Sequence, residues 1–337
     1  MSEALSKTSR QPPHPLPRAY SLLSPAMEKI EARLEETIQS AVRLVPEVSH
    51  HLIGSGGKRI RPTLLMLIAR ANGSNADSGL DLAVASELFH NATLLHDDVV
   101  DRGHFRRGVP AAPRIFGNAA SVLVGDFLLA KAFGIVVQHG DLDLLRELSR
   151  IVQNMAEGEV MQLIRSGQAT LSMPGYEEII SGKTAGLFSW CCRAGASLSA
   201  GTPQLLEAAA AYGKSFGMAF QVTDDILDYT APLEESGKDL ANDLRQGKTT
   251  LPLLLACERD QDLLDAVVVL SKQGPTEEKC QEIVRRVLET SAIERARDMA
   301  AELASRAKGL LAEFPDGPAV ESLRELTSYV VDRVTIR

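Results

Sequence analysis

Residues 92–108 read ATLLHDDVVDRGHFRRG, and this stretch decides how the rest of the chain is interpreted. An apolar run compatible with a helix ends in three carboxylates, Asp97, Asp98 and Asp101. On a helix, Asp97 and Asp101 would share one face, with their Cβ atoms roughly 5–6 Å apart. Like charges at that spacing destabilise a helix, so the pattern calls for a compensating cation.

A second acidic run repeats this design in residues 220–229, which read FQVTDDILDY. Asp224, Asp225 and Asp228 again follow an apolar stretch, and Asp224 and Asp228 are again four residues apart. A single run of this kind is usually a solvated helix end, but two runs favour one shared purpose. Hard divalent cations prefer carboxylate oxygen, and Mg²⁺ commonly completes its shell with water and substrate phosphates. We therefore expect two acidic helix faces that hold Mg²⁺ and a diphosphate between them.

Basic residues that a diphosphate would need stand near both acidic runs. Residues 54–62 read GSGGKRIRP, which places cations at the start of a predicted helix, where anions bind readily. A lone Arg or Lys is usually a solvated surface charge, but together with the aspartates these residues favour an anionic ligand. The cations in question are Lys58, Arg59, Arg61, Arg106, Arg107, Lys183, Lys238 and Lys248.

The composition excludes some classes of function. The chain has 337 residues, 45% hydrophobic residues and a formal net charge of −8, which argues against nucleic acid as a partner. Its four cysteines show no metal-binding spacing, so we expect reduced thiols in a cytoplasmic protein. The longest apolar window, residues 119–137, contains Asp126 and Lys131. We therefore expect a buried helix there and no transmembrane segment.

Helical periodicity dominates the chain, and turn signals fall between segments of helix length. The fold class that follows is all-α. No change in composition divides residues 21–337, so we expect a single domain there, after a proline-rich lead-in at residues 1–20 that we expect to be disordered. The charged segment 230–247 is expected to be an exposed loop. The expected helices span 24–50, 61–73, 79–101, 117–138, 141–167, 174–200, 203–229, 249–272, 276–289, 292–313 and 317–334.

These motifs resemble the trans-isoprenyl (polyprenyl) diphosphate synthase family. Within that family they are most similar to the octaprenyl-type long-chain synthases. The resemblance covers about Gly54 to Pro252, and it rests on GGKRIRP, LLHDDVVD with RRG, GNAASVLVGDFLL, GEVMQL, SGKTAGLF, FQVTDDILDY and GKDLANDLRQGKTTLP. It implies an isoprenoid-synthase helical bundle around a deep central cavity, usually as a homodimer. The implied reaction is the Mg²⁺-dependent head-to-tail condensation of isopentenyl diphosphate with an allylic prenyl diphosphate.

The resemblance also implies roles for single residues. Catalytic roles fall on Asp97, Asp98, Asp101, Asp224, Asp225, Asp228 and Lys183, with Asp97, Asp101 and Asp224 as the metal ligands. Contacts to the allylic diphosphate would come from Arg106, Lys183, Thr184, Gln221 and Lys238, with Lys248 nearby. Contacts to isopentenyl diphosphate would come from Lys58, Arg61, His90 and Arg107. For His90 and Gln221, an ordinary polar role in the core is the alternative.

Product length would depend on the space beside the helix that carries the first acidic run. Ala92 and Thr93 are small, and the resemblance links small residues there to longer products. Phe89 lies about 12 Å along the helix from Asp97, so it is a candidate floor or an ordinary core residue. Met161 is a further candidate liner. We predict a medium- or long-chain product of the octaprenyl type, with geranylgeranyl as the shorter alternative.

Two other classes of function share part of the pattern. A terpene cyclase or a squalene-type synthase also binds a diphosphate through metal ions held by aspartates, but it need not bind isopentenyl diphosphate. The basic motifs GGKRIRP and RRG therefore count against these enzymes. A non-catalytic partner subunit of a heteromeric prenyltransferase commonly loses acidic residues, whereas both acidic runs are intact here.

Overall fold

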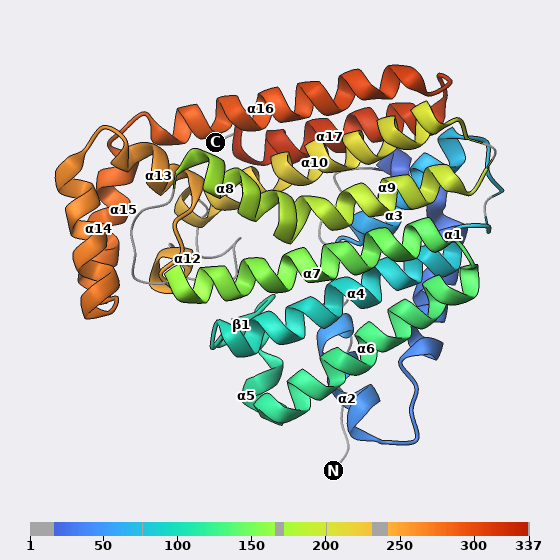
Figure 1. Cartoon of the computed structure of the whole chain (residues 1–337), viewed down its shortest axis with the longest axis horizontal. Coiled ribbons are helices and arrows are strands. Elements are labelled where there is room, and N and C mark those ends of the chain that lie inside the picture. The colour runs from blue at the N-terminus through green and yellow to red at the C-terminus, as the bar shows by residue number, and fades with distance from the viewer. Residues whose placement is uncertain (1–16, 76, 166–171, 200, 231–241, 336–337) are drawn as a thin grey trace, which may run out of the picture.

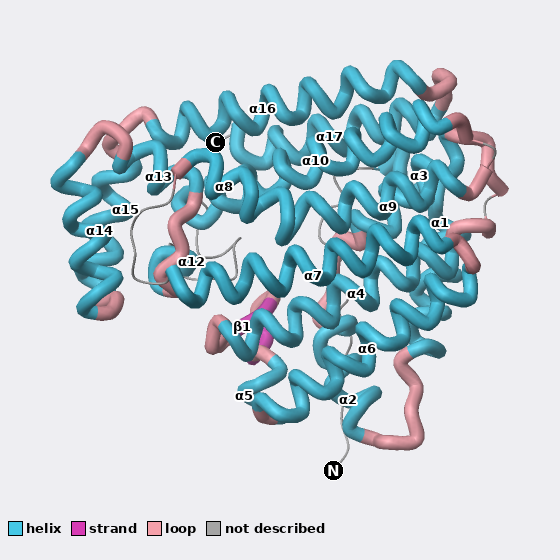
Figure 2. The backbone as a smooth tube through the Cα atoms, viewed as in Figure 1, coloured by secondary structure: helices cyan, strands magenta, loops and turns pink. Residues whose placement is uncertain are grey.

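The computed structural model describes residues 17–75, 77–165, 172–199, 201–230 and 242–335. The predicted all-α class is confirmed, because helices make up most of this part of the chain (Figures 1 and 2). The strands in the described residues form one small hairpin, in which β1 (Phe105–Arg106) pairs antiparallel with β2 (Val109–Pro110).

The structure resolves the helices as follows. In chain order they are α1 (Pro17–Thr37), α2 (Leu44–Gly54), α3 (Ile60–Ala71), α4 (Leu80–Val100), α5 (Ala112–Phe116), α6 (Asn118–His139), α7 (Leu142–Arg165), α8 (Met173–Ile180), the π-helical segment Ser181–Ala185, α9 (Gly186–Ser197), α10 (Pro203–Thr230), α12 (Asn242–Arg245), α13 (Leu251–Cys257), α14 (Gln261–Gln273), α15 (Glu277–Leu288), α16 (Ala292–Leu310), the 3₁₀ turn Leu311–Glu313 and α17 (Pro318–Thr335).

Two segments predicted as single helices are divided in the structure. The predicted helix 24–50 is split between α1 and α2 by a turn in which the Ser40 hydroxyl accepts the Val42 N–H at 3.2 Å. The predicted helix 249–272 is split between α13 and α14, because the Asp260 side chain accepts the Leu263 N–H at 2.9 Å and caps α14.

The predicted boundaries near the N-terminus and in the charged segment also change. α1 begins at Pro17, and Ala19 is buried, so the expected disordered lead-in does not extend to residue 20. Residues 1–16 lie outside the described residues. Within the expected exposed loop 230–247, residues 242–245 form α12 and Leu244 is buried, whereas residues 231–241 are not described.

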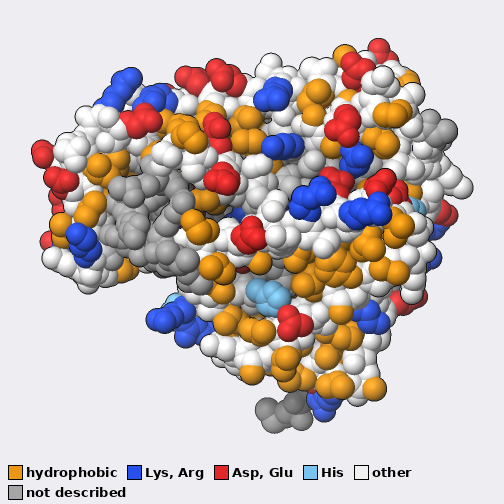
Figure 3. Space-filling model, in the orientation of Figure 1, with side chains coloured by type: hydrophobic (Ala, Val, Ile, Leu, Met, Phe, Trp, Pro, Cys, Tyr) orange, Lys and Arg blue, Asp and Glu red, His pale blue; other side chains and the backbone are white. Residues whose placement is uncertain are grey.

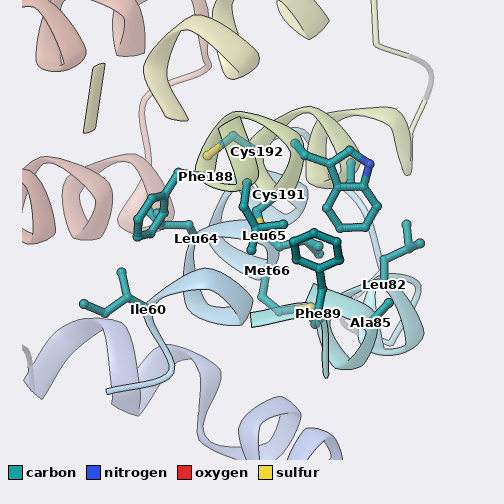
Figure 4. Packing of buried hydrophobic residues seen from close by; sticks show 14 of the residues in the cluster. Ile60, Leu64, Leu65, Met66, Leu82, Ala85, Phe89, Phe188, Cys191 and Cys192 are labelled. Carbon is teal, nitrogen blue, oxygen red and sulfur yellow. The ribbon is translucent and has the colours of Figure 1, made fainter. Parts of the chain in front are cut away.

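Two apolar clusters form the core of the molecule. The larger cluster joins α1, α3, α4, α6, α9, the first half of α10 and α17. In Figure 4, Phe89 of α4 lies among Leu65 and Met66 of α3 and residues of α9. The second cluster joins α8, the end of α10 and α13 to α16, at the left of Figure 1. The second acidic run therefore lies where α10 passes from one cluster to the other.

α6 is the helix that the sequence predicted to be buried, and this prediction is wrong for much of its surface. Its inner face packs along α4, but Leu123 is 66% exposed and Val137 is 57% exposed. α6 is long and apolar enough to cross a membrane, yet only 39% of its apolar window is buried within the molecule. The described residues therefore leave an apolar face of α6 uncovered.

Candidate active site

The first acidic run lies at the end of α4, and its aspartates have different partners. Asp98 is buried and accepts a hydrogen bond from Arg106 Nε of the hairpin at 3.0 Å. Asp97 and Asp101 face lysines instead, because Lys183 Nζ lies 4.0 Å from Asp97 and Lys248 Nζ lies 2.6 Å from Asp101. These lysines supply the compensating cations that the like-charged helix face requires.

The second acidic run, on α10, divides in the same way. Asp224 is 39% exposed at its side chain and faces Arg333 of α17 at 2.9 Å. Asp225 is buried and is held by Tyr176 Oη at 2.7 Å and Gln221 Nε2 at 2.9 Å. Asp228 accepts the backbone N–H groups at the start of α12, both at 3.2 Å.

Burial raises the pKa of two of these carboxyl groups. It raises the pKa of Asp225 to about 7, against the hydrogen bonds from Gln221 and Tyr176 that favour the charged form. Burial also raises the pKa of Asp97, and the Lys183 ammonium partly offsets this. Both carboxyl groups are therefore harder to ionise than an exposed aspartate, because burial weakens the solvation of the charged form.

The π-helical segment connects the two acidic runs. Lys183 contacts Asp97 of the first run and also bonds to Glu159 of α7. Its neighbour Thr184 donates to Gln221 at 2.7 Å, and Gln221 in turn donates to Asp225. A π-helical turn inside a helix is costly and occurs frequently at functional sites. Here the wider turn directs consecutive side chains to α4 and to α10.

The predicted metal ligands fit a magnesium site that is completed by substrate. Asp97, Asp101 and Asp224 each face a cation and keep part of their side chain exposed. By contrast, Asp98 and Asp225 are buried, and Asp228 accepts two backbone N–H groups. Across the described ranges, no three His, Cys, Asp or Glu side chains already form a metal cluster. This arrangement suits Mg²⁺, which takes one or two carboxylates and leaves its other positions to water and phosphate oxygens.

The predicted isopentenyl side is a cluster of basic residues with an unusual backbone. Arg59, Arg102 and Arg107 are the non-glycine residues with positive φ in the described chain, a conformation that persists only where surrounding contacts hold it. Arg107 also approaches the backbone of Gly57, where an added Cβ would lie 3.2 Å from its guanidinium. A larger residue at position 57 would require this guanidinium and that of Arg59, 3.1 Å from the added Cβ, to shift.

Carboxylates divide the basic residues into two groups. Arg59 pairs with Glu87 and Glu31, and Arg106 pairs with Asp98. By contrast, three of the predicted ligand-binding cations have no carboxylate within 4.0 Å among the described residues. These three are Lys58, Arg61 and Arg107, all assigned from the sequence to isopentenyl diphosphate.

Lys58 and Arg107 are exposed, whereas Arg61 is part-buried. Burial lowers the pKa of Arg61, whose guanidinium lies 4.5 Å from the Phe188 ring and whose Nε is buried without a partner. Burial, and next the charges of Arg61 and Arg107, lower the pKa of His90 well below its usual range. His90 is therefore a neutral imidazole beside cations, and an anion bound here would relieve their repulsion.

The remaining predicted residues have mixed outcomes. Lys238 lies outside the described residues. Phe89 and Ala92 are buried in the larger core cluster, and Thr93 donates to the His90 carbonyl at 2.8 Å. Met161 is 43% exposed on α7, so it does not share the buried layer of Phe89.

Sequence reasoning missed several residues that hold the site. Glu87 lies three residues before His90 on the same helix, so helical spacing could have identified it. Glu159 lies within the GEVMQL motif, whose sequence alone assigns this residue no role. Tyr329 and Arg333 on the last helix carry no motif that points to the site.

Comparison with known proteins gives consistent matches over nearly the whole chain. The family model described as polyprenyl synthetase matches residues 42–288. The octaprenyl diphosphate synthase of Escherichia coli (strain K12) is 36% identical over 94% of this chain and 99% of its own length. The all-trans-nonaprenyl-diphosphate synthase (geranyl-diphosphate specific) of Rhodobacter capsulatus is 37% identical over 93% of this chain and 97% of its own. The crystal structure of polyprenyl synthase from Caulobacter crescentus CB15, complexed with calcium and isoprenyl diphosphate, is similar with a TM-score of 0.88 and 40% identity over 93% of this chain and 96% of that chain.

Proposed function

The chain belongs to the polyprenyl synthetase family, and from this premise we propose that it is a Mg²⁺-dependent trans-polyprenyl diphosphate synthase. It condenses isopentenyl diphosphate head to tail with an allylic prenyl diphosphate. One observation carries the proposal. Two acidic runs are joined through Lys183 and Thr184, and they lie beside basic residues for which the described part of the chain supplies no carboxylate partner.

The residues on the acidic side bind and activate the allylic diphosphate. Asp97, Asp101 and Asp224 would hold Mg²⁺, which when bound supplies the positive charge that stabilises a departing diphosphate. Lys183 and Lys248 already lie against the first acidic run, so their ammonium groups are close to where the diphosphate would bind. Preorganised cations of this kind stabilise charge that develops as the allylic carbon–oxygen bond breaks.

The residues on the basic side bind the second substrate. Lys58, Arg61 and Arg107 would pair with the diphosphate of isopentenyl diphosphate. The neutral His90 can donate one hydrogen bond there without adding to the repulsion among the arginines. The double bond of isopentenyl diphosphate then attacks the allylic carbon, and a proton leaves to the released diphosphate, so the reaction needs no protein nucleophile.

The product is a medium- or long-chain polyprenyl diphosphate. The octaprenyl and nonaprenyl synthases among the relatives support this length, as do the small side chains of Ala92 and Thr93 just before the first acidic run. The geranylgeranyl diphosphate synthase of Methanosarcina mazei is 34% identical over 85% of this chain and 89% of its own. Geranylgeranyl diphosphate therefore remains the shorter alternative.

Two copies of the chain associate through the exposed face of α6. Figure 3 shows hydrophobic side chains gathered over the lower part of the molecule, where Figure 1 places α6. A second copy of the same face would cover Val122, Leu123 and Val137, and an apolar patch of this extent commonly marks an interface. Leu123→Glu should convert a dimer into a monomer in sedimentation equilibrium, and a wild-type monomer would contradict the dimer.

The four free cysteines suit a cytoplasmic location.

The direct test of the function is product formation. Purified protein is incubated with labelled isopentenyl diphosphate, Mg²⁺ and each allylic primer, and the products are sized. A ladder that ends near octaprenyl supports the proposed reaction and length, whereas termination at geranylgeranyl supports the reaction alone. No elongation with any primer would instead favour a non-catalytic partner subunit or a cyclase.

The metal ligands are tested by substitution. Asp97→Ala and Asp224→Ala should each lower turnover at least about 10²-fold and leave the helical circular dichroism spectrum unchanged. Unchanged turnover in both variants would contradict the proposed metal site.

A further inference from the structure

Lys58 is held in place by two tyrosines from opposite ends of the chain. The hydroxyl of Tyr20, on α1, donates to the Lys58 backbone carbonyl at 2.6 Å. The hydroxyl of Tyr329, on α17, accepts a hydrogen bond from the Lys58 ammonium at 3.1 Å, and the same ammonium lies 5.4 Å from the Tyr329 ring centroid. One tyrosine therefore fixes the backbone of residue 58, and the other fixes its charge.

The helix that carries Tyr329 is well anchored at this position. Arg18 of α1 forms ion pairs with Glu321 and Glu325 of α17, which joins the two helices that supply the tyrosines. One turn beyond Tyr329, Arg333 contacts Asp224 of the second acidic run at 2.9 Å. The end of α17 therefore faces both the basic and the acidic side of the site.

The contact with Tyr329 matters because the described residues give the Lys58 ammonium no other hydrogen-bond or ion-pair partner. An exposed lysine on a glycine-rich segment samples many rotamers, and fixing such a side chain on ligand binding costs roughly 0.5–1.5 kcal/mol. A phenol leaves the ammonium fully charged, whereas a carboxylate partner would neutralise it. Tyr329 can therefore hold the ammonium in one direction and still leave it able to bind an anion.

We propose that Tyr329 is a positioning residue for isopentenyl diphosphate: it holds the Lys58 ammonium in the orientation that binds the substrate diphosphate. This inference rests on the proposed function, in that the anion is the diphosphate of isopentenyl diphosphate. Tyr329 itself acts only through Lys58.

Two substitutions separate the hydroxyl from the ring. Tyr329→Phe keeps the ring contact and removes the hydrogen bond, so the KM for isopentenyl diphosphate should rise about two- to five-fold. Tyr329→Leu removes both contacts, and the rise should reach about ten-fold. For both variants the KM of the allylic primer should stay unchanged, and kcat should change less than about two-fold, because only ground-state binding at one site is weakened. A rise of similar size in both KM values would instead indicate general disturbance of the site and would overturn the proposal.

A double-mutant cycle identifies Lys58 as the route of the effect. The dissociation constant of isopentenyl diphosphate is measured by titration calorimetry in the wild-type and Lys58→Met backgrounds. Tyr329→Phe should weaken binding in the first background and have no effect in the second. Tyr20→Phe is the matched control: its hydroxyl bonds the backbone, so any effect on binding should persist when the Lys58 ammonium is absent. Equal effects of Tyr329→Phe in both backgrounds would overturn the proposal.

The same titrations distinguish failure of the inference from failure of the proposed function. If the wild-type protein binds isopentenyl diphosphate and Tyr329→Phe binds it equally well, only the positioning role is wrong. If the wild-type protein does not bind isopentenyl diphosphate, the proposed function fails and this inference fails with it.

Discussion

One guanidinium with two carboxylate partners allows a sharp test of how the basic cluster is built. Arg59 is 9% exposed at its side chain, and it bonds Glu87, 3% exposed, at 2.9 Å and Glu31, 47% exposed, at 2.7 Å. Glu87→Gln and Glu31→Gln each remove one carboxylate charge beside the same arginine. Glu31 accepts from two Arg59 nitrogens and Glu87 from one, so the more buried partner is the one with fewer bonds.

The two substitutions should lower the free energy of unfolding by different amounts. Removal of one member of a buried ion pair typically costs 3–5 kcal/mol, because the remaining charge is left desolvated. Glu31 still accepts from Arg59 in the Glu87→Gln variant, so we expect the lower end, about 3 kcal/mol. The exposed partner is worth at most about 1 kcal/mol, and Glu31→Gln should cost no more than that.

Equilibrium urea unfolding, followed by far-ultraviolet circular dichroism, measures both free energies of unfolding. A secondary readout is the KM for isopentenyl diphosphate, which should rise in Glu87→Gln because Arg59 holds the segment that carries Lys58. Equal losses of stability in the two variants, or a loss below about 1 kcal/mol for Glu87→Gln, would refute the claim that burial of this pair organises the cluster.

Three further predictions follow from single contacts. Asp225 has a pKa of about 7 in the folded protein, above the ordinary aspartate value of 3.8. The folded state therefore binds the extra proton, and stability should fall from about pH 4 to pH 7, at up to ~1.4 kcal/mol per pH unit. Asp225→Asn should flatten this slope in urea titrations, and an unchanged slope would contradict the assignment. Gly195→Ala should lower the free energy of unfolding by about 1–3 kcal/mol, because the added Cβ would lie 2.3 Å from a backbone oxygen of α3. The control is Gly134→Ala on α6, whose Cβ meets nothing within 4 Å, so this variant should be neutral or stabilising. Similar thermal midpoints for the two variants would disprove this. Arg333→Gln frees Asp224 from its counter-ion, so titration with Mn²⁺ alone should show binding about two- to five-fold tighter, and weaker or unchanged binding would contradict the competition.

Local features of the fold and the site were predictable from the sequence. The acidic runs could be assigned to helix ends because their four-residue spacing and the preceding apolar residues need only local geometry. The same reasoning failed for the predicted helix 24–50, where no Gly or Pro lies between residues 26 and 45 to mark the break. The turn there is made by the Ser40 side chain, a weaker signal than a proline.

Contacts between distant segments could not be predicted in this way. Asp97 and Asp98 are neighbours in one motif, yet one faces a lysine and the other is buried against Arg106. This division depends on where the π-helical segment and the hairpin lie, and the spacing within the motif carries no information about that. Tyr329 and Lys58 are separated by most of the chain, and no local pattern connects them.

The distribution of charge explains why the basic cluster points to a ligand more strongly than its motif does. Burying a guanidinium without a carboxylate partner costs free energy that a folded protein usually avoids. This chain supplies carboxylates to Arg59 and Arg106, and it is acidic overall, so acidic residues are not scarce. Arg61 nevertheless remains part-buried, with its Nε buried and unpartnered beside the neutral His90. Under the proposed function, a carboxylate at that position would occupy the place of the substrate diphosphate, so a bound substrate would supply the missing partner.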